Sequence, residues 1–481
     1  MNEAIIKKSG WSLYKDKRLL ILAVIVFCLT LSILYSLEIL SLELVFAMSI
    51  LPFLPCLFLL RQEALLLALV ATYFGATYFS SSLVIEGLIR GLFLLFIGLV
   101  LLLKSGAKKV ITRISTPLDK IIVIWFIIIL FSFIYGFFFK HNNGRYLMGD
   151  LYKFVEIFLV FWLTTLIVKN DRQTRFLIWG FLMLALMFGA VDSIIFLKRW
   201  SLVGSALLAR VRAAAQFSSI FALILGICLI LHERRIIVRA VLMFLSFGLL
   251  VSFLLTFLRT GYIVLPATLA FVIFLYLYKN RRYPWAGIMK FIIFGVFLLI
   301  FVGLFNLIVA SIYPGMDIIK STSARFGSLV DPVGADPMGV RMLEINSIIS
   351  GVIALSPFLG NGLGGEYYSA TLVDGELQWG MKHFVHNNYF DFLVRTGMLG
   401  LIVFLVFVFI YLRNSIKFYL RSSSGFHQGV LLGTIGIFVS SCLIALSTSP
   451  IYSPFLFMMV ALTYCVTHLE EKRTPGEPKV E

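Results

Sequence analysis

Several arginines lie on what we predict below to be the outer side of a membrane, where basic residues are uncommon. A guanidinium group stays charged, and its planar fork binds phosphate oxygens in a bidentate manner. Several of them converging at the membrane surface would suit a diphosphate whose lipid tail stays in the bilayer. The alternative for each is contact with lipid phosphates, and for Arg341 also an ion pair with Glu344 three residues later. The candidates are Arg210, Arg212, Arg259, Arg325 and Arg341.

His386 is the candidate for proton transfer. It is followed by Asn387 and Asn388 at the start of a predicted helix. The helix dipole there would favour the neutral imidazole, the form that can accept a proton. A single loop histidine is also commonly structural, so residue type and spacing leave both interpretations open. His383, three residues earlier and without the following asparagines, is expected to matter much less.

The sequence indicates neither a metal nor a cofactor. It contains no Asp-x-Asp motif, which a nucleotide-sugar donor held through a divalent cation would be expected to need. The five cysteines all lie within apolar runs, where a thiol behaves as a small hydrophobic group, so no metal cluster or disulfide framework is indicated. We therefore expect chemistry that uses arginine for charge and histidine for proton transfer.

The composition shows which kind of fold must position these residues. Of the 481 residues, 60% are hydrophobic and 14% are charged, against about 45–50% and about 25% in an ordinary soluble domain. The apolar residues are gathered into segments of about 18–22, each long enough to cross a bilayer as a helix. A water-soluble fold is excluded, and the sequence predicts an all-α polytopic membrane protein. The net charge of +17 resides mostly in short loops beside the membrane, where it reports orientation.

About fourteen transmembrane helices are predicted, with twelve or thirteen as alternatives because the third and sixth are weak. Basic residues in every predicted inward loop place both termini in the cytoplasm. The predicted organisation is a cytoplasmic segment 1–18, helices over 19–312, a large outer loop 313–397, helices over 398–469 and a cytoplasmic tail 470–481. The predicted spans are near 19–37, 42–60, 64–82, 84–103, 121–139, 151–168, 176–196, 213–232, 240–258, 261–278, 291–312, 398–412, 429–446 and 451–469.

The 313–397 loop carries the candidate histidine. A connection this long usually has a function. Asp336 and Pro337 suit the N-cap and first turn of an amphipathic helix that ends before Ser356. A second helix is predicted to begin at His386-Asn387 and to continue past Gly397 into the next span.

The residues around His386 resemble the His-Asn signature of the O-antigen ligase and O-antigen polymerase superfamily. The segment FVHNNYFDFLVRTGMLGL (384–401) contains the His-Asn pair, then a helix, then a Gly-x-x-Gly element. Upstream, LSPFLGNGLGG (355–365) is similar to the family's Pro-x-x-Gly-x-Gly turn, and Arg341 matches the arginine that precedes it.

The resemblance covers residues from about 210 to 412. TFLRTG (256–261) is similar to the family's Ser-Arg-Gly/Thr element at a helix end, although Leu258 stands where the family often has serine. Residues 213–219 lack the usual Gly-Asn-Pro-Asn run, which leaves open whether Arg210 or Arg212 is the matching arginine.

The resemblance implies transfer of a glycan from an undecaprenyl-diphosphate carrier to a sugar hydroxyl at the periplasmic face of a bacterial inner membrane. Under this reading His386 is the base, Asn387 and Arg325 support it, and no metal takes part. The diphosphate would be bound by Arg259, Arg341 and Arg212, or Arg210 in its place. The acceptor is a lipid A core sugar for a ligase, or a lipid-linked repeat unit for a polymerase that works with a chain-length regulator. Nucleic acid is not an expected partner.

The main alternative is a transporter or flippase of lipid-linked glycans. Glu86, Arg90 and Asp192 would then be intramembrane coupling residues. A Glu86–Arg90 pair on one helix face and an outer-end position for Asp192 favour structural roles instead. A transporter also gives no reason for a long outer loop carrying His386. A peptidoglycan-type polymerase would share the donor chemistry without explaining the His-Asn element.

Overall fold

The computed structural model describes residues 62–79, 113–203, 216–312 without 257 and 283, 319–321, 323, 337–448 without 374 and 375, and 450–472. These residues form a bundle of helices and one two-stranded hairpin. Every predicted span that falls on them coincides with a helix. The predicted spans near 19–37, 42–60 and 84–103 lie outside the described residues, so the total of fourteen stays a prediction.

The helices of the bundle begin and end within a few residues of the predicted spans, except where they extend further into the loops. The helix at the sixth predicted span begins at Gly144 rather than at residue 151, and the helix at the eleventh begins at Pro284 rather than at residue 291. The helices are α4 (Gln62–Phe79), α6 (Asp119–Phe138), α7 (Gly144–Ile167), α8 (Asp171–Val203), α10 (Gln216–His232), α11 (Ile236–Leu255), α12 (Arg259–Lys279), α13 (Pro284–Ile312), α16 (Asn388–Arg421), α17 (Gly425–Ile444) and α18 (Pro454–Glu471).

The surface of this bundle is suited to lipid. Six of the described helices are long and apolar enough to cross a membrane, namely α6, α8, α11, α12, α16 and α17. Large apolar side chains stand exposed along α6, α13 and α16, for example Phe131, Leu299 and Phe409. Lipid tails can cover such a surface, whereas soluble proteins rarely expose apolar patches of this extent. The chain is therefore a helical membrane protein.

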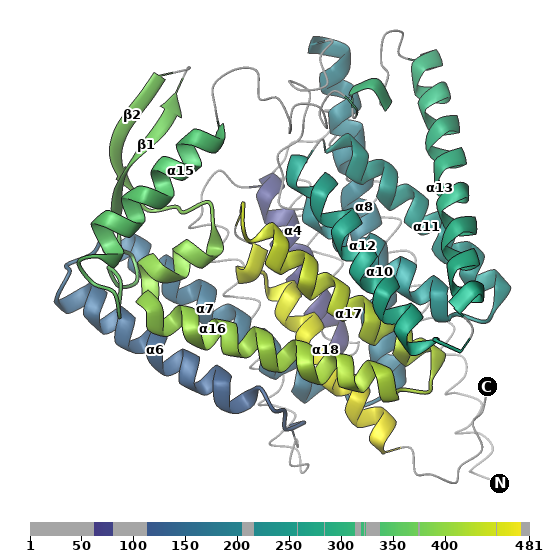
Figure 1. The fold of residues 1–481 in the computed structure, drawn as a ribbon, viewed down its shortest axis with the longest axis horizontal. Helices are drawn as coiled ribbons and strands as arrows, with labels where there is room; N and C mark the ends of the chain where they lie inside the picture. The colour runs from purple at the N-terminus through teal and green to yellow at the C-terminus, as the bar shows by residue number, and fades with distance from the viewer. Residues whose placement is uncertain are drawn as a thin grey trace, which may run out of the picture.

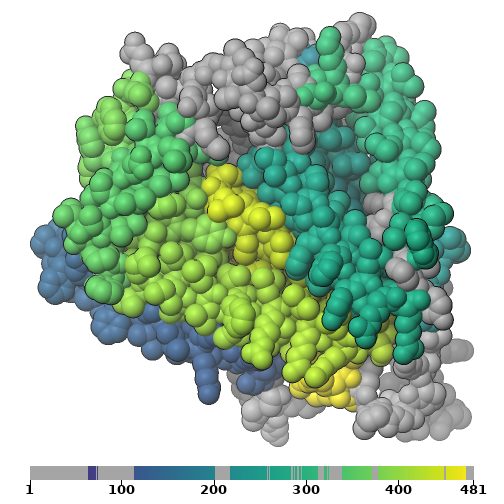
Figure 2. All heavy atoms as spheres, in the orientation of Figure 1, coloured from purple at the N-terminus to yellow at the C-terminus, as the bar shows by residue number. Residues whose placement is uncertain are grey.

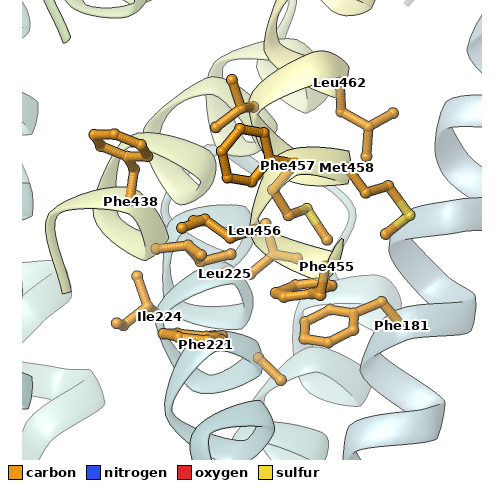
Figure 3. Packing of buried hydrophobic residues seen from close by; sticks show 14 of the residues in the cluster. Phe181, Phe221, Ile224, Leu225, Phe438, Phe455, Leu456, Phe457, Met458 and Leu462 are labelled. Carbon is orange, nitrogen blue, oxygen red and sulfur yellow. The ribbon is translucent and has the colours of Figure 1, made fainter. Parts of the chain in front are cut away.

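The core lies where α17 and α18 pack against α7, α8 and α10. The ring of Phe455 stacks on Phe181 with centroids 3.9 Å apart and lies 5.9 Å from Phe221 (Figure 3). Glycines let α17 approach α10 closely, because a Cβ at Gly429 would lie only 3.1 Å from the Leu229 Cα. Small residues at a helix contact commonly allow such close packing in membranes.

The predicted outer and inner loops meet at opposite ends of the bundle. Helices α16 and α17 each run from one end to the other, so their termini mark both ends. At the predicted outer end the Asn388 backbone N–H donates to the Ala445 carbonyl (2.9 Å). At the predicted inner end Lys279 Nζ donates to the Ser422 carbonyl (2.7 Å). These two contacts lie at opposite ends of α16.

The described part of the large loop forms a compact block above the outer end of α16. It contains α15 (Pro337–Ile348), which continues into a π-helical turn over Ile349–Ile353. The strands β1 (Tyr367–Val373) and β2 (Glu376–Lys382) follow, and the chain then enters α16. The helix predicted after Asp336-Pro337 and the helix predicted to pass Gly397 are both confirmed, with a kink at Gly397 (φ 62°). Figure 1 shows α15 and the hairpin side by side at this end.

The hairpin is a departure from the sequence analysis, which expected only helices in this loop. Strands β1 and β2 pair antiparallel, with Val373 opposite Glu376. Tyr367 is buried, whereas its neighbour Tyr368 is exposed, as the alternation of a strand requires. The strands are separated in the sequence by Asp374-Gly375, a dipeptide typical of two-residue hairpin loops. That signal was present in the sequence and was missed.

Candidate functional site

His386 and Glu344 form a hydrogen-bonded pair at the predicted outer end of the bundle. The His386 Nδ1 atom lies 3.2 Å and 3.3 Å from the two carboxylate oxygens of Glu344. The Tyr367 hydroxyl lies 2.5 Å from Glu344 Oε1 and 2.8 Å from the carbonyl oxygen of Phe384. These residues are distant in the chain and meet only because α15, β1 and the start of α16 pack together.

Local structure explains how each side chain reaches this point. Glu344 sits on the face of α15 that turns toward β1, and its neighbours on that face, Ile348 and Val352, pack on Tyr367. His386 immediately precedes the N-cap of α16. The N-cap is Asn387, whose side-chain oxygen accepts from the backbone N–H groups of Tyr389 and Phe390 at 2.9 Å and 3.4 Å. The cap fixes the direction in which the chain leaves His386.

The environment keeps Glu344 ionised. Burial alone would raise the pKa of Glu344, but hydrogen bonds from His386 and Tyr367 outweigh burial and hold that pKa below its ordinary value of 4.5. Burial, followed by the adjacent Glu344 carboxylate, raises the pKa of Tyr367 well above its ordinary value of 10.0. The tyrosine therefore stays protonated and donates.

A carboxylate accepts hydrogen bonds only, so Nδ1 of His386 must carry the proton that it shares with Glu344. The Nε2 atom is then the nitrogen that can accept a proton, as in other histidines oriented by a carboxylate. The His386 side chain is 49% exposed, so this nitrogen belongs to a ring that a large polar substrate can approach. The arrangement can serve as a general base.

The other side of the site is formed by the turn after α17 and by the beginning of α12. The Asn387 amide donates to the carbonyl of Leu446 (3.2 Å). The next residue, Ser447, shares a hydrogen bond with Thr260 between their hydroxyl oxygens (2.9 Å). Arg259, the first residue of α12, is therefore close in the fold to the His386 region through this turn. Figure 2 shows yellow atoms from the C-terminal part of the chain between green and teal parts of the molecule.

Arg341 lies one helical turn before Glu344 on α15, with its side chain partly exposed. The sequence analysis offered an Arg341–Glu344 ion pair as the alternative to an anion site. In the described part of the chain Glu344 is instead hydrogen-bonded to His386 and Tyr367. The carboxylate thus has two partners, and a role for Arg341 in binding an anion stays a prediction.

The remaining predicted residues are placed only in part. Arg210, Arg212 and Arg325 lie outside the described residues. For Arg259 the structure gives the backbone, at the start of α12, and not the side chain. The structure thus connects Asn387 to Thr260, the residue after Arg259, through the turn at Leu446 and Ser447. Arg341 lies on the helix that supplies the partner of His386.

The glycine-rich segment forms a turn that packs closely against the bundle. Gly360, Gly362 and Gly364 have φ angles of 64°, 79° and 72°, a backbone conformation that residues other than glycine rarely adopt. A Cβ at Gly362 would lie 2.7 Å from the Gly136 backbone of α6, and one at Gly364 would lie 2.6 Å from the Leu147 nitrogen of α7. The loop block is therefore seated directly on two helices of the bundle.

Sequence reasoning missed Glu344 and Tyr367 as partners of His386, and it missed the contacts of His383. His383 is part of a buried charged network with Asp150 and Arg395, and its ring stacks on Tyr146 with centroids 4.2 Å apart. The expectation that replacing His383 matters much less than replacing His386 stays a prediction. The sequence carried no local signal for these contacts, which join residues from separate elements.

Among the described residues, no group of three or more His, Cys, Asp or Glu side chains is arranged to hold a metal ion. A scan against protein-family models and a search of curated proteins both found no match to this chain. Its function is therefore inferred from the geometry of the His386 site together with the short motifs in the sequence.

Proposed function

We propose that this protein transfers a glycan from an undecaprenyl-diphosphate carrier to a sugar hydroxyl at the periplasmic face of a bacterial inner membrane. The observation that carries the proposal is the half-exposed His386 ring, whose Nδ1 is held 3.2 Å from the buried Glu344 carboxylate. Such a pair supplies a base at the membrane surface, where the hydroxyl of an acceptor sugar can reach it. The His-Asn and Pro-x-x-Gly-x-Gly motifs support the same function.

The proposed reaction is a single displacement. The acceptor hydroxyl gives its proton to His386 Nε2 while its oxygen attacks the anomeric carbon of the donor. The bond between that carbon and the diphosphate oxygen breaks, and its electron pair leaves with the diphosphate. Arginine stabilises the charge on the leaving group without a metal. We assign Arg259 and Arg341 to this role, together with Arg212 or Arg210.

The proposal requires that the end of the bundle carrying His386 faces the periplasm. Support comes from the charge at the other end, where the loops are basic as in cytoplasmic loops of membrane proteins. The basic residues described there include Arg234, Arg235, Arg281, Arg282, Arg413 and Arg421.

The orientation is tested by cysteine labelling. A cysteine introduced at Asp374 should react with a membrane-impermeant maleimide in cells whose outer membrane is permeabilised, whereas one at Arg282 should react only after lysis. Labelling at position 282 with protection at position 374 would reverse the assignment.

The function itself is tested with purified protein in detergent. We expect transfer of glycan from a purified polyprenyl-diphosphate donor to an acceptor, with equal rates in the presence and absence of a chelator. Supplying either a lipid A core acceptor or a second lipid-linked unit separates ligase from polymerase. Movement of the donor across proteoliposomes without any transfer product would instead identify the transporter considered from the sequence.

A further inference from the structure

A second set of charged groups lies buried behind the candidate site. It consists of Asp150 at the start of α7, His383 before α16, Asp391 and Arg395 on α16, and Tyr452 beyond α17, and we call it the Asp150 cluster. Arg395 Nε lies 3.1 Å from Asp150 and 3.3 Å from Asp391. The Tyr452 hydroxyl donates to Asp391 (2.5 Å). Arg395 and both acids are at least nine-tenths buried. The proposed reaction uses none of them directly.

The cluster holds the chain segment that leads to His386. Arg395 Nη1 donates to His383 Nδ1 (2.9 Å), and Nη2 donates to the His383 carbonyl. Since Nδ1 accepts, the His383 proton is on Nε2, which lies 3.3 Å from Asp150. The ring is also clamped by Tyr146, which stacks on it with an angle of 9° between the planes. His383 is thus fixed on its ring, on its backbone and on both nitrogens, three residues before His386.

The same cluster holds the glycine-rich turn. The Gly364 N–H donates to Asp150 Oδ2 (3.0 Å), and Arg395 Nη1 donates to the Gly365 carbonyl (2.6 Å). The turn leads directly into β1, which carries Tyr367 two residues later. The Asp150–Arg395 ion pair therefore anchors both chain segments that lead to Glu344. One segment carries His386 and the other carries Tyr367.

We propose that Asp150 and Arg395 are positioning residues, which fix His386 and Tyr367 against Glu344 so that the imidazole keeps the orientation needed for proton transfer. This inference rests on the proposed function. A purely structural role would lower the amount of folded protein without changing what the folded fraction does. A positioning role changes the chemical step itself, since small displacements of a catalytic group have large effects on rate.

The test variant is Asp150→Asn, which keeps the shape of the side chain and removes its charge. We expect kcat for transfer to fall about 10–100-fold, with KM for the lipid-linked donor within about twofold of the parent. The matched control is Asp171→Asn, which removes a carboxylate 3.0 Å from His427 at the opposite end of the bundle. The control should leave kcat unchanged. An unchanged kcat in Asp150→Asn would overturn the positioning role.

A double variant separates positioning from a general loss of structure. If Asp150 acts through His386, then Asp150→Asn combined with His386→Ala should be no slower than His386→Ala alone. Multiplication of the two effects would show that Asp150 acts on something else and would overturn the inference.

A second readout does not depend on activity. Diethyl pyrocarbonate modifies imidazole nitrogens, and mass spectrometry of the peptide containing His386 gives the rate at that residue. We expect severalfold slower modification of His386 in Asp150→Asn, because Nε2 loses the basicity that the Nδ1 contact with Glu344 gives it, and no change in Asp171→Asn. An unchanged rate would overturn the positioning role. Slower modification of His386 in Asp150→Asn, together with no transfer by the parent protein, would leave the positioning intact and overturn the proposed function.

Tyr146→Leu provides the same measurements should Asp150→Asn fail to insert. It removes the ring stacked on His383 without removing a charge. We expect the same direction of change in kcat and in the modification rate of His386, and unchanged values for both would contradict the inference.

Discussion

The two ends of the bundle each contain a histidine in contact with a carboxylate, and they differ in access. At one end His386 Nδ1 lies 3.2 Å from Glu344, and the histidine side chain is 49% exposed. At the other end His427 Nε2 lies 3.0 Å from Asp171, its Nδ1 lies 3.9 Å from Glu470, and its side chain is 1% exposed. The first histidine leaves one nitrogen for a substrate, whereas the second faces carboxylates on both sides.

The difference shows that a histidine–carboxylate contact alone does not indicate catalysis. His427 lies on α17, while Asp171 and Glu470 lie on α8 and α18, so the inner-end contacts join three helices. Glu470 also accepts from the Ser422 hydroxyl (3.0 Å) and from the Ser423 N–H (2.7 Å). These contacts close the inner end of the bundle. At the other end the His386 ring instead lies at the surface, in the loop region that also carries Arg341 and Asn387.

The largest effect is expected from Glu344→Gln. The Tyr367 hydroxyl would donate to the oxygen of the introduced side-chain amide, so the amide NH₂ would face His386 and donate to Nδ1. The imidazole proton would then be on Nε2, which could no longer accept a proton. We expect transfer to fall on the order of 10²–10⁴-fold, the range of a lost general base. Rates are compared with those of Asp171→Asn, the inner-end counterpart, which should match the parent. Equal loss in both variants would show that the two ends do not differ in function.

A smaller effect is expected from Arg259→Lys. Lysine keeps one positive charge and loses the bidentate fork, so a diphosphate leaving group is less well stabilised. We expect transfer to fall about tenfold, with normal membrane insertion. Arg239→Lys, at the inner end of α11, is the control and should have no effect on transfer. Parental activity in Arg259→Lys would indicate that this arginine contacts lipid phosphates instead.

Acidification should lower the stability of the folded loop that contains α15, β1 and β2, because Glu344 becomes protonated. The pKa of Glu344 in the folded protein is below 4.5 because of its hydrogen bonds. The unfolded state therefore binds the proton first as the pH falls, and the contribution of Glu344 to stability is complete above pH 4.5 and is lost as the pH drops through the lower, folded-state pKa. Limited proteolysis of the loop at pH 6 and pH 3.5 should show this loss in the parent and a smaller change in Glu344→Gln. Identical pH dependence in both would contradict the stabilising pair.

The smallest single effect is expected from Tyr367→Phe. Glu344 keeps its contact with His386 and loses one donor, so transfer should change by only about two- to fivefold. In the Glu344→Gln background the same change should restore activity in part, because the amide oxygen is released to face His386. An additive loss in the double variant would contradict the tautomer argument.

The sequence predicts most of the bundle because apolar runs of membrane length leave few alternatives to a helix. It also predicts α15 from Asp336-Pro337 and the start of α16 from His386-Asn387, since caps are local signals. The hairpin was missed because two seven-residue strands inside a mixed polar loop give a weak pattern, although Asp374-Gly375 marked its turn.

The sequence gives less information about which residues form the site. Glu344 has an arginine three residues earlier, and local spacing favoured that pair, whereas the fold gives the carboxylate to His386, 42 residues away. The same holds for Asp150 and Arg395, which come from different helices. Contacts of this kind depend on how elements pack, and a single sequence contains no record of that packing.

The most direct test of the account is transfer by purified His386→Ala, measured together with binding of the polyprenyl-diphosphate donor in the same preparation. The account predicts that donor binding stays close to that of the parent, because the arginines remain, while transfer falls about 10²–10⁴-fold. Transfer close to the parental rate would remove His386 from the reaction. Loss of donor binding would move His386 to the diphosphate and contradict its role as the base for the acceptor.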